Sequence, residues 1–275
     1  RRAYGPLEKV IATCGTEKVA ITDDGTWGHV PLSKLCKNPI YGVEIAFVED
    51  SKERSKQPIN YITFLAKNNK GLKEIYNLTS MATAKENFYY VPRLDYPCLF
   101  DVSDDVYILS GSNPNWGLLP KNKQVFAEIN PMSTRKVLDL KFPLVATSDN
   151  FYPTLSDKAV YQVLNEWEYK SAIPWSPQEA IDNTHIIAND CNAFLTEAKL
   201  VEFKKTKTLL QLCEEGSIKL KVDLSKTNYR ERLMYELGLI DKKKYEDYFF
   251  VIADMVNYAK QHMLVGPARG SSAGS

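Results

Sequence analysis

The chain is poor in the residues that mark disulfide-bonded or zinc-binding proteins. It has five cysteines and three histidines among 275 residues, and no two cysteines have the Cys-x-x-Cys spacing of a zinc or redox motif. An odd number of widely spaced cysteines is typical of reduced thiols. These scarcities exclude a zinc finger and predict a cytoplasmic protein.

Long apolar runs are also missing. The sequence has no stretch of about 18 apolar residues, the length needed to cross a bilayer as a helix. It begins Arg1-Arg2-Ala3-Tyr4, without an initiating methionine or the apolar core of a signal peptide. We therefore expect no membrane segment.

Neither sign of charge dominates. Lys and Arg number 35 and Asp and Glu 34, a formal net charge of +1, which argues against a domain that wraps nucleic acid over its whole surface. Two local clusters remain, Lys204, Lys205 and Lys207 and then Lys242 to Lys244. Such clusters are most often solvated helix faces, and contact with DNA phosphates is the alternative.

Short β-rich runs alternate with helical periodicity up to about residue 170. This alternation predicts an α/β fold with parallel strands, as a barrel or an open sheet. The predicted strands are Val19 to Thr22, Tyr41 to Val48, Ile59 to Ala66, Val106 to Leu109, Val125 to Ile129 and Leu144 to Thr147. The predicted helices are Leu7 to Ala12, Lys70 to Ala84 and Leu155 to Tyr169, with an exposed polar loop over Lys52 to Pro58.

Polar residues gather where these strands end. Asp23 and Asp24 follow the first strand, Glu44 lies within the second, and Ser112 and Asp149 follow later strands. Carboxylates that converge at the carboxyl ends of parallel strands are able to coordinate divalent cations. The same residue types also cap helices and form hydrogen bonds within loops. Composition does not separate the two interpretations.

A strongly periodic helix comes before the final residues. Its apolar face is predicted to pack on another element and consists of Tyr245, Tyr248, Phe249, Ile252, Met255, Val256 and Ala259. A brief strand, Met263 to Val265, is expected next. The last ten residues, Gly266-Pro267-Ala268-Arg269-Gly270-Ser271-Ser272-Ala273-Gly274-Ser275, combine small residues with one arginine. Such a loop lets a polyphosphate approach backbone N–H groups, whereas a flexible Gly/Ser terminus has the same composition.

This helix and loop resemble the palm entry of bacterial replicative DNA polymerases of the family C, or DNA polymerase III alpha, type. The family pattern is Gly-Pro-Gly-Arg-Gly-Ser-Ala-Ala-Gly-Ser, from which this chain departs at Ala268 and Ser272. The resemblance implies a nucleotidyltransferase palm whose loop holds the triphosphate of the incoming nucleotide. It assigns that role to Arg269, Gly270, Ser271, Gly274 and Ser275.

The earlier part of the chain resembles the PHP (polymerase and histidinol phosphatase) domain of the same family. Matching stretches include Ala20 to Gly25, Tyr41 to Glu44, Phe88 to Asp95, Ile108 to Gly111 and Leu144 to Asp149. The resemblance implies an α/β, PHP-type (β/α) barrel of about seven strands over residues 1–194. The first, mainly helical part of the palm then follows over residues 195–275.

The resemblance also implies a degenerate PHP metal site. Asp23, Glu44 and Asp149 remain, but Asp24, Tyr61 and Phe151 stand where histidines are common, and Ser112 stands where a cysteine is common. Neutral imidazole suits Zn²⁺ and Mn²⁺, whereas carboxylates alone leave a hard-cation site with internal repulsion. We expect the PHP metal to be absent, with a Mg²⁺ or Mn²⁺ site at Asp23, Asp24, Glu44 and Asp149 as the alternative.

The function implied is that of part of a DNA-directed DNA polymerase used in replication. Mg²⁺ is expected for the complete enzyme. The expected partners are primer–template DNA, deoxynucleoside triphosphates, the remainder of the polymerase, a sliding clamp and other replisome proteins. The family's catalytic aspartates follow the loop, so none is expected within this chain, which should be inactive alone. A free-standing PHP-type phosphoesterase or exonuclease, and a non-catalytic scaffold subunit, are the alternatives.

Overall fold

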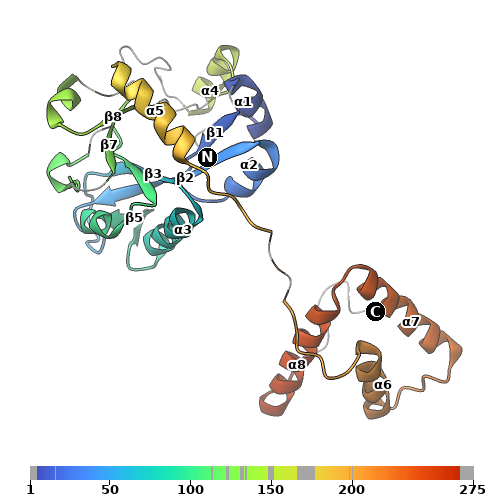
Figure 1. Ribbon diagram of the computed structural model, residues 1–275. Helices are drawn as coiled ribbons and strands as arrows, with labels where there is room; N and C mark the ends of the chain where they lie inside the picture. Colours follow the sequence, from blue (N-terminus) through green and yellow to red (C-terminus); the bar gives the residue numbers. More distant parts are fainter. Residues whose placement is uncertain are drawn as a thin grey trace. The chain divides into compact units, whose positions relative to one another are not determined.

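The computed structural model describes residues 5–266, except 16, 113, 122–123, 131–132, 134, 148–151, 166–176, 198 and 200. The chain divides into two compact units, Arg1–Thr196 and Glu197–Ser275, here called unit 1 and unit 2 (Figure 1). Each unit is described by itself. In the part of the chain so described, no helix is long and apolar enough to cross a membrane.

Unit 1 is built on a mixed, curled sheet of half-barrel shape. Its strands are β1 (Lys18–Ile21), β2 (Asn38–Val48), β3 (Asn60–Ala66), β4 (Phe88–Tyr89), β5 (Val91–Asp95), β6 (Val106–Leu109), β7 (Val125–Ile129) and β8 (Leu144–Ala146). The sheet order is β4-β5-β2-β3-β6-β7-β8, and β1 also pairs with β2. The predicted α/β class is confirmed. The six predicted strands are all present, and β4 and β5 add to them.

The expectation of an all-parallel sheet was wrong at β3. This strand runs antiparallel to both of its neighbours, β2 and β6, while β1, β2, β5, β6, β7 and β8 share one direction. The reason is the connection from β2 to β3, which contains no helix. A parallel pair needs a crossover of about a dozen residues or more, usually a helix, so this polar loop closes an antiparallel hairpin instead.

Helices cover both faces of the sheet. Unit 1 contains α1 (Leu7–Cys14), α2 (His29–Leu35), α3 (Asn69–Thr83), α4 (Lys158–Asn165) and α5 (Gln178–Asp190), with short 3-10 turns at Tyr96–Asp101, Trp116–Leu118, Arg135–Leu140 and Leu155–Asp157. The predicted helices near residues 7, 70 and 155 are therefore present, although the last begins as a 3-10 turn. Residues 166–169 of that prediction lie outside the described residues.

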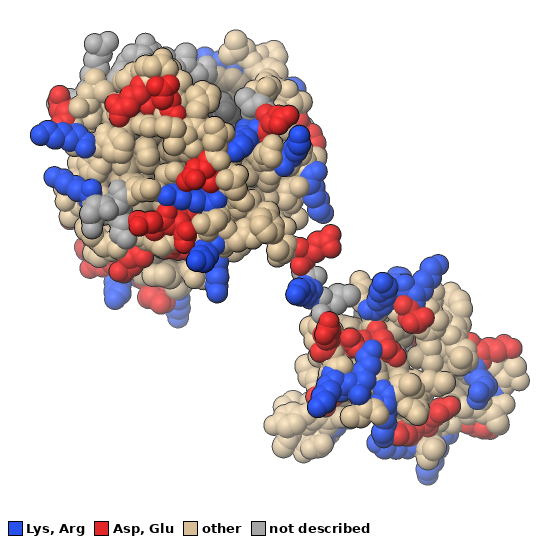
Figure 2. All heavy atoms as spheres, viewed as in Figure 1, with Lys and Arg blue, Asp and Glu red and all other residues tan. Residues whose placement is uncertain are grey.

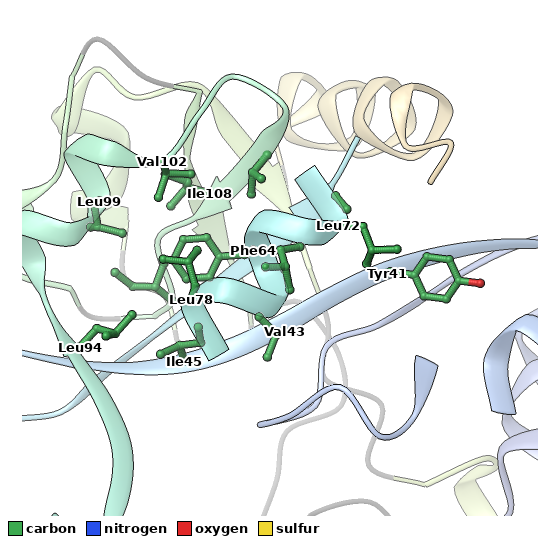
Figure 3. Packing of buried hydrophobic residues seen from close by; sticks show 14 of the residues in the cluster. Tyr41, Val43, Ile45, Phe64, Leu72, Leu78, Leu94, Leu99, Val102 and Ile108 are labelled. Atoms are coloured by element: carbon green, nitrogen blue, oxygen red, sulfur yellow. The ribbon is translucent and has the colours of Figure 1, made fainter. Parts of the chain in front are cut away.

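Alternating side chains of the central strands feed two apolar clusters. On one face, Val43 and Phe64 pack with Ile108 and with Leu72 and Leu78 of α3 (Figure 3). On the other face, side chains from the same strands and from β8 pack against α5; this cluster is Ile40, Leu65, Tyr107, Leu109, Val145, Ile187 and Cys191. Because successive side chains of a strand point to opposite faces of the sheet, the same strands contribute to both clusters.

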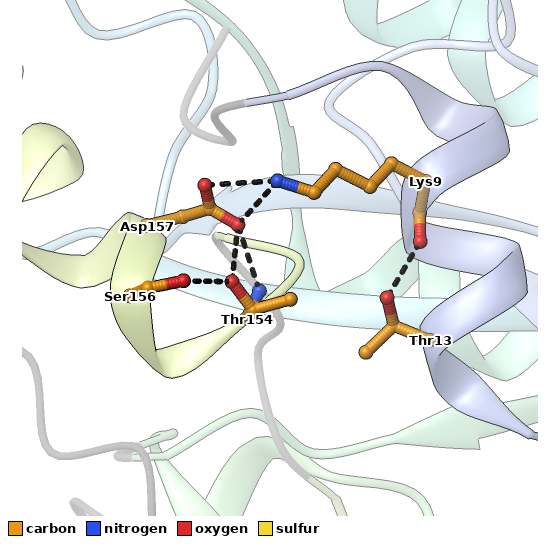
Figure 4. A network of polar contacts seen from close by, with 5 residues as sticks. All are labelled: Lys9, Thr13, Thr154, Ser156 and Asp157. Atoms are coloured by element: carbon orange, nitrogen blue, oxygen red, sulfur yellow. Dashed lines mark hydrogen bonds and ion pairs between the residues drawn. The ribbon is translucent and has the colours of Figure 1, made fainter.

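Polar contacts bind the first helix to a late segment of unit 1. Lys9 of α1 forms an ion pair of 2.9 Å with Asp157. Asp157 also accepts a hydrogen bond from the Thr154 N–H at 3.1 Å, which is part of a capping box at the Leu155–Asp157 turn (Figure 4). The N-terminal helix is thereby held to residues 148 positions later in the sequence.

Unit 2 consists of α6 (Leu209–Leu220), α7 (Thr227–Lys242) and α8 (Glu246–His262). Thr208 and Gln211 form a capping box that starts α6. Phe203 stacks on Phe250 of α8, with ring centroids 5.6 Å apart and an interplanar angle of 11°. The mainly helical character expected of this region is confirmed.

The predicted packing face of α8 is only partly covered within unit 2: Ile252, Val256 and Ala259 are half-buried. Tyr248 and Met255 of that face are 59% and 57% exposed, while Phe250, which was not assigned to it, is buried. The strand expected after α8 was wrong. Residues 263–265 form no strand. Met263 caps the C-terminus of α8, and its N–H donates a hydrogen bond to the Ala259 carbonyl. The chain is irregular directly after this residue.

Candidate functional site

The shared strand direction brings the carboxyl ends of β1, β6, β7 and β8 to the same edge of the sheet. Asp23 and Asp24 follow β1, Ser112 follows β6, and Thr147 follows β8. Glu44 lies inside β2. Asp23, Asp24, Ser112 and Thr147 therefore follow strands whose carboxyl ends share one edge of the sheet.

Asp24 and Glu44 line one small pocket. β1 pairs with β2 only as far as Tyr41, and β5 pairs with it only from Ala46. A pocket of about 70 Å³ lies at the gap between these pairings, and its polar lining comes from Asp24, Glu44, Tyr61, Thr79 and Thr83. Carboxylate and hydroxyl oxygens therefore face this space without any imidazole.

Asp23 is held beside this pocket by the backbone. Its carbonyl accepts a hydrogen bond of 2.9 Å from the Glu44 N–H, which extends the pairing of the first two strands. Burial raises the pKa of the Asp23 carboxyl above its ordinary value, and the neighbouring charge of Asp24 raises it further. Without a cation between them, a negative charge on Asp24 thus makes ionisation of Asp23 less favourable.

His29 lies closer to this region than its isolated position in the sequence indicates. It is buried at the start of α2, where its Nε2 is 2.8 Å from the Gly42 carbonyl oxygen and its Nδ1 is 3.2 Å from the Tyr76 hydroxyl. Burial lowers the pKa of the His29 imidazole, and the hydrogen bond to Gly42 and the charge of Asp23 only partly oppose this. Both ring nitrogens have protein partners, so His29 joins β2 to α3.

A second polar cluster, missed from the sequence, centres on Glu128 of β7. Its carboxylate accepts hydrogen bonds from the Gly111 N–H at 3.1 Å and from the Thr147 hydroxyl. Asn130 donates to the Ser112 hydroxyl at 2.7 Å. The only sequence signal was a single glutamate inside the apolar run Val125–Ile129. Direct hydrogen bonds therefore join the ends of β6, β7 and β8.

Gly111 allows this cluster to form. It adopts φ of +73°, and a Cβ placed there would lie 2.0 Å from the Tyr61 carbonyl oxygen. A side chain at this position would be strained by the backbone conformation and would collide with β3.

The described residues hold only part of the predicted carboxylate set. In the portion of the chain that the structure describes, no three His, Cys, Asp or Glu side chains are arranged to hold an ion. Asp149, the fourth member of the predicted carboxylate set, and Phe151 lie outside the described residues. The predicted four-carboxylate site is therefore only partly placed.

The predicted triphosphate loop lies almost wholly outside the described residues. The chain is described through Gly266, four residues after α8 ends, so Arg269, Gly270, Ser271, Gly274 and Ser275 are not placed. Their role stays a prediction from the sequence.

Two lysines of the first cluster in unit 2 are paired with acidic side chains. Lys205 pairs with Glu246 at 2.6 Å and with Asp247 at 2.7 Å, and Lys207 pairs with Glu215 at 2.6 Å. These two lysines are thus engaged within the unit. On the face shown in Figure 2, Lys and Arg side chains are intermixed with Asp and Glu side chains.

Comparison with known proteins gives two family matches. Residues 5–132 match the PHP domain, and residues 207–275 match the bacterial DNA polymerase III alpha NTPase domain. These matches fall in unit 1 and unit 2 respectively.

Similar proteins align with nearly the whole chain. DNA polymerase III subunit alpha of Staphylococcus aureus is 30% identical over an alignment covering 98% of this chain and 28% of its own length. The subunits of Borreliella burgdorferi and Ureaplasma parvum are each 26% identical, covering 95% and 99% of this chain and 29% and 30% of their own lengths. The chain thus spans about three tenths of these relatives.

Proposed function

Because this chain joins a PHP domain to part of the NTPase domain of bacterial DNA polymerase III alpha, and so belongs to that family, we propose that it is part of a DNA-directed DNA polymerase used in replication. The observation that carries the proposal is the alignment of polymerase subunits across both units of one chain. A free-standing PHP phosphoesterase would not account for the NTPase match in unit 2.

The loop after α8 is proposed to hold the triphosphate of the incoming nucleotide. Arg269 neutralises phosphate charge, the N–H groups of Gly270 and Gly274 donate hydrogen bonds, and Ser271 and Ser275 orient the phosphate oxygens. The support is the motif itself, which falls within the region matched to the NTPase domain. Carboxylates that hold two Mg²⁺ ions would supply the phosphoryl-transfer chemistry in the complete enzyme.

The PHP domain, assigned here to residues 1–194, is proposed to act mainly as a scaffold. Asp24 and Glu44 line a pocket whose lining holds no imidazole, and both ring nitrogens of the nearby His29 already have protein partners. The ends of β6, β7 and β8 are joined by direct hydrogen bonds to Glu128 and Asn130. Protein groups therefore already satisfy polar atoms at the edge where a metal would otherwise organise them.

Metal removal tests this scaffold role. We expect elemental analysis of the purified chain to find no stoichiometric Mg²⁺, Mn²⁺ or other divalent metal, and chelator to leave the thermal unfolding midpoint unchanged. A bound metal whose removal lowers that midpoint, and whose binding is lost in Glu44→Gln, would establish a metal site instead.

The proposed partners are primer–template DNA, deoxynucleoside triphosphates and the remainder of the polymerase, together with a sliding clamp and other replisome proteins in the cytoplasm. The family's catalytic aspartates follow the loop. We therefore expect residues 1–275 alone to bind nucleotide without incorporating it.

Nucleotide binding to the 275-residue chain tests the loop assignment. Titration calorimetry with a deoxynucleoside triphosphate should show saturable binding that Arg269→Ala weakens about tenfold or more, because one charge-assisted contact contributes about 1.5–3 kcal/mol. Arg230→Ala, which removes an exposed arginine of α7, is the matched control. Equal affinities for wild type and Arg269→Ala would contradict the assignment.

A further inference from the structure

The β4–β5 hairpin carries an aromatic residue in an unusual position. β4 and β5 pair through Phe88 with Pro92 and Tyr89 with Val91, which leaves Tyr90 alone at the tip. Tyr90 adopts φ of +60° and is 85% exposed. Both properties are unfavourable for a tyrosine, since the left-handed region suits glycine and a large ring gains from burial. Nothing in the fold of the hairpin requires a tyrosine here.

The ring of Tyr90 is nevertheless held in place. It packs edge-on against Tyr89, with centroids 4.7 Å apart and an interplanar angle of 78°. The guanidinium of Arg93 lies 4.9 Å from the Tyr89 ring centroid, and Arg93 is itself only 2% exposed and donates to the Glu53 carbonyl. Buried Arg93 therefore contacts half-buried Tyr89, which in turn contacts exposed Tyr90.

The base of the hairpin is fixed as well. Arg54, from the β2–β3 loop, donates to the carbonyls of Phe88 and Lys85, the latter at 2.8 Å. Asn87 donates to the Met81 carbonyl at the end of α3 at 2.9 Å and accepts from the Ser51 hydroxyl at 3.0 Å. These contacts preorganise the exposed ring, so a ligand that covers it need not order the hairpin.

We propose that Tyr90 is a stacking platform for an unpaired base of single-stranded DNA, such as the template strand; this rests on the proposed function, which makes DNA a partner of the chain. Every base has a flat face that stacks on an aromatic ring without regard to sequence. Phe88 and Tyr90 are the large apolar side chains of the hairpin that are classed as exposed. Two aromatic rings offer a base a flat stacking face but are a small apolar core for a stable protein interface, which disfavours a protein as the occupant.

The charges around the hairpin predict how binding at Tyr90 should depend on salt. Arg54 and Lys85 lie beside it, but Glu53 and Glu86 occupy the same segments. Stacking therefore contributes more than phosphate neutralisation at this point, and binding through Tyr90 should depend only weakly on salt.

Fluorescence anisotropy with a labelled oligothymidylate tests the proposal on the 275-residue chain. Tyr90→Ala should weaken binding about 5- to 150-fold, the range for losing one base–aromatic stack, and Tyr90→Phe should bind like wild type. Leu155→Ala, which removes another exposed apolar side chain of unit 1, 77% exposed, is the matched control. An abasic oligonucleotide of equal charge should bind wild type weakly and lose nothing further in Tyr90→Ala.

Tyr90→Gly separates this contact from a structural role. Glycine suits φ of +60°, so this variant should unfold at the same temperature as wild type or higher while binding the strand as weakly as Tyr90→Ala. Unchanged strand binding in Tyr90→Ala or Tyr90→Gly, or no strand binding by wild type, would overturn the proposal. Nucleotide binding measured on the same samples depends on Arg269 rather than Tyr90, so failure of one assignment is distinguishable from failure of the other.

Discussion

His29 shows how much a single side chain contributes that its sequence context does not reveal. Its flanking residues predict nothing beyond an isolated histidine, yet it is 1% exposed and joins the Gly42 carbonyl to the Tyr76 hydroxyl. The groups facing it are Tyr41, Tyr76 and Asp23. Tertiary packing, rather than local pattern, gives this residue its role.

The pH dependence of folding should report on His29. Because burial lowers its pKa below 6.5 in the folded state, the unfolded chain binds a proton first as the pH falls. Stability is therefore fully present above pH 6.5 and declines below it, down to the lowered pKa. Urea unfolding at pH 7.5 and 5.5 should show this loss.

The matched variant for that measurement is His29→Gln, whose amide retains a hydrogen-bond donor. It should be less stable by about 1–3 kcal/mol at pH 7.5, because a buried hydrogen bond and its packing are disturbed. Its loss of stability between pH 7.5 and 5.5 should be smaller than that of wild type. Equal losses in the two proteins would show that His29 is not the titrating group.

At the scale of elements, strand positions were predictable and strand direction was not. An apolar run has the same pattern in either strand direction. The periodicity of Tyr41–Val48 and Ile59–Ala66 therefore located β2 and β3 but did not give their directions. The connection held the missing information, because its polar residues and lack of helical pattern are those of a hairpin loop. The two-residue strand β4 was too short for any periodic signal.

The start of α3 offers a direct test of how local sequence fixes an element. Asn68 accepts hydrogen bonds from the N–H groups of Lys70 and Gly71, at 2.8 and 3.2 Å, and also donates to Asp105. Asn68→Ala should lower the free energy of unfolding by about 1–2 kcal/mol. Asn77→Ala, at an exposed position within the same helix, should be neutral or slightly stabilising. Equal destabilisation by both substitutions would remove the capping role.

At the scale of the whole molecule, the order of the two domains was predictable because each domain has its own local sequence motifs. The two family matches, at residues 5–132 and 207–275, follow the order expected from the sequence. The side chains of the strand-end edge were harder to predict. Glu128 resembles an ordinary strand residue until β6, β7 and β8 are aligned, since its partners Gly111 and Thr147 are 17 and 19 positions away.

We propose that Arg269 binds the incoming nucleotide in a replicative polymerase. Primer extension by the complete protein is the most direct test of this proposal, with wild type, Arg269→Ala and the control Arg230→Ala compared over a range of nucleotide concentrations. Arg269→Ala should raise the apparent nucleotide KM and slow incorporation by roughly 100-fold or more, because the lost contact stabilises charge during phosphoryl transfer, while Arg230→Ala remains like wild type. Unchanged incorporation kinetics in Arg269→Ala would contradict the account.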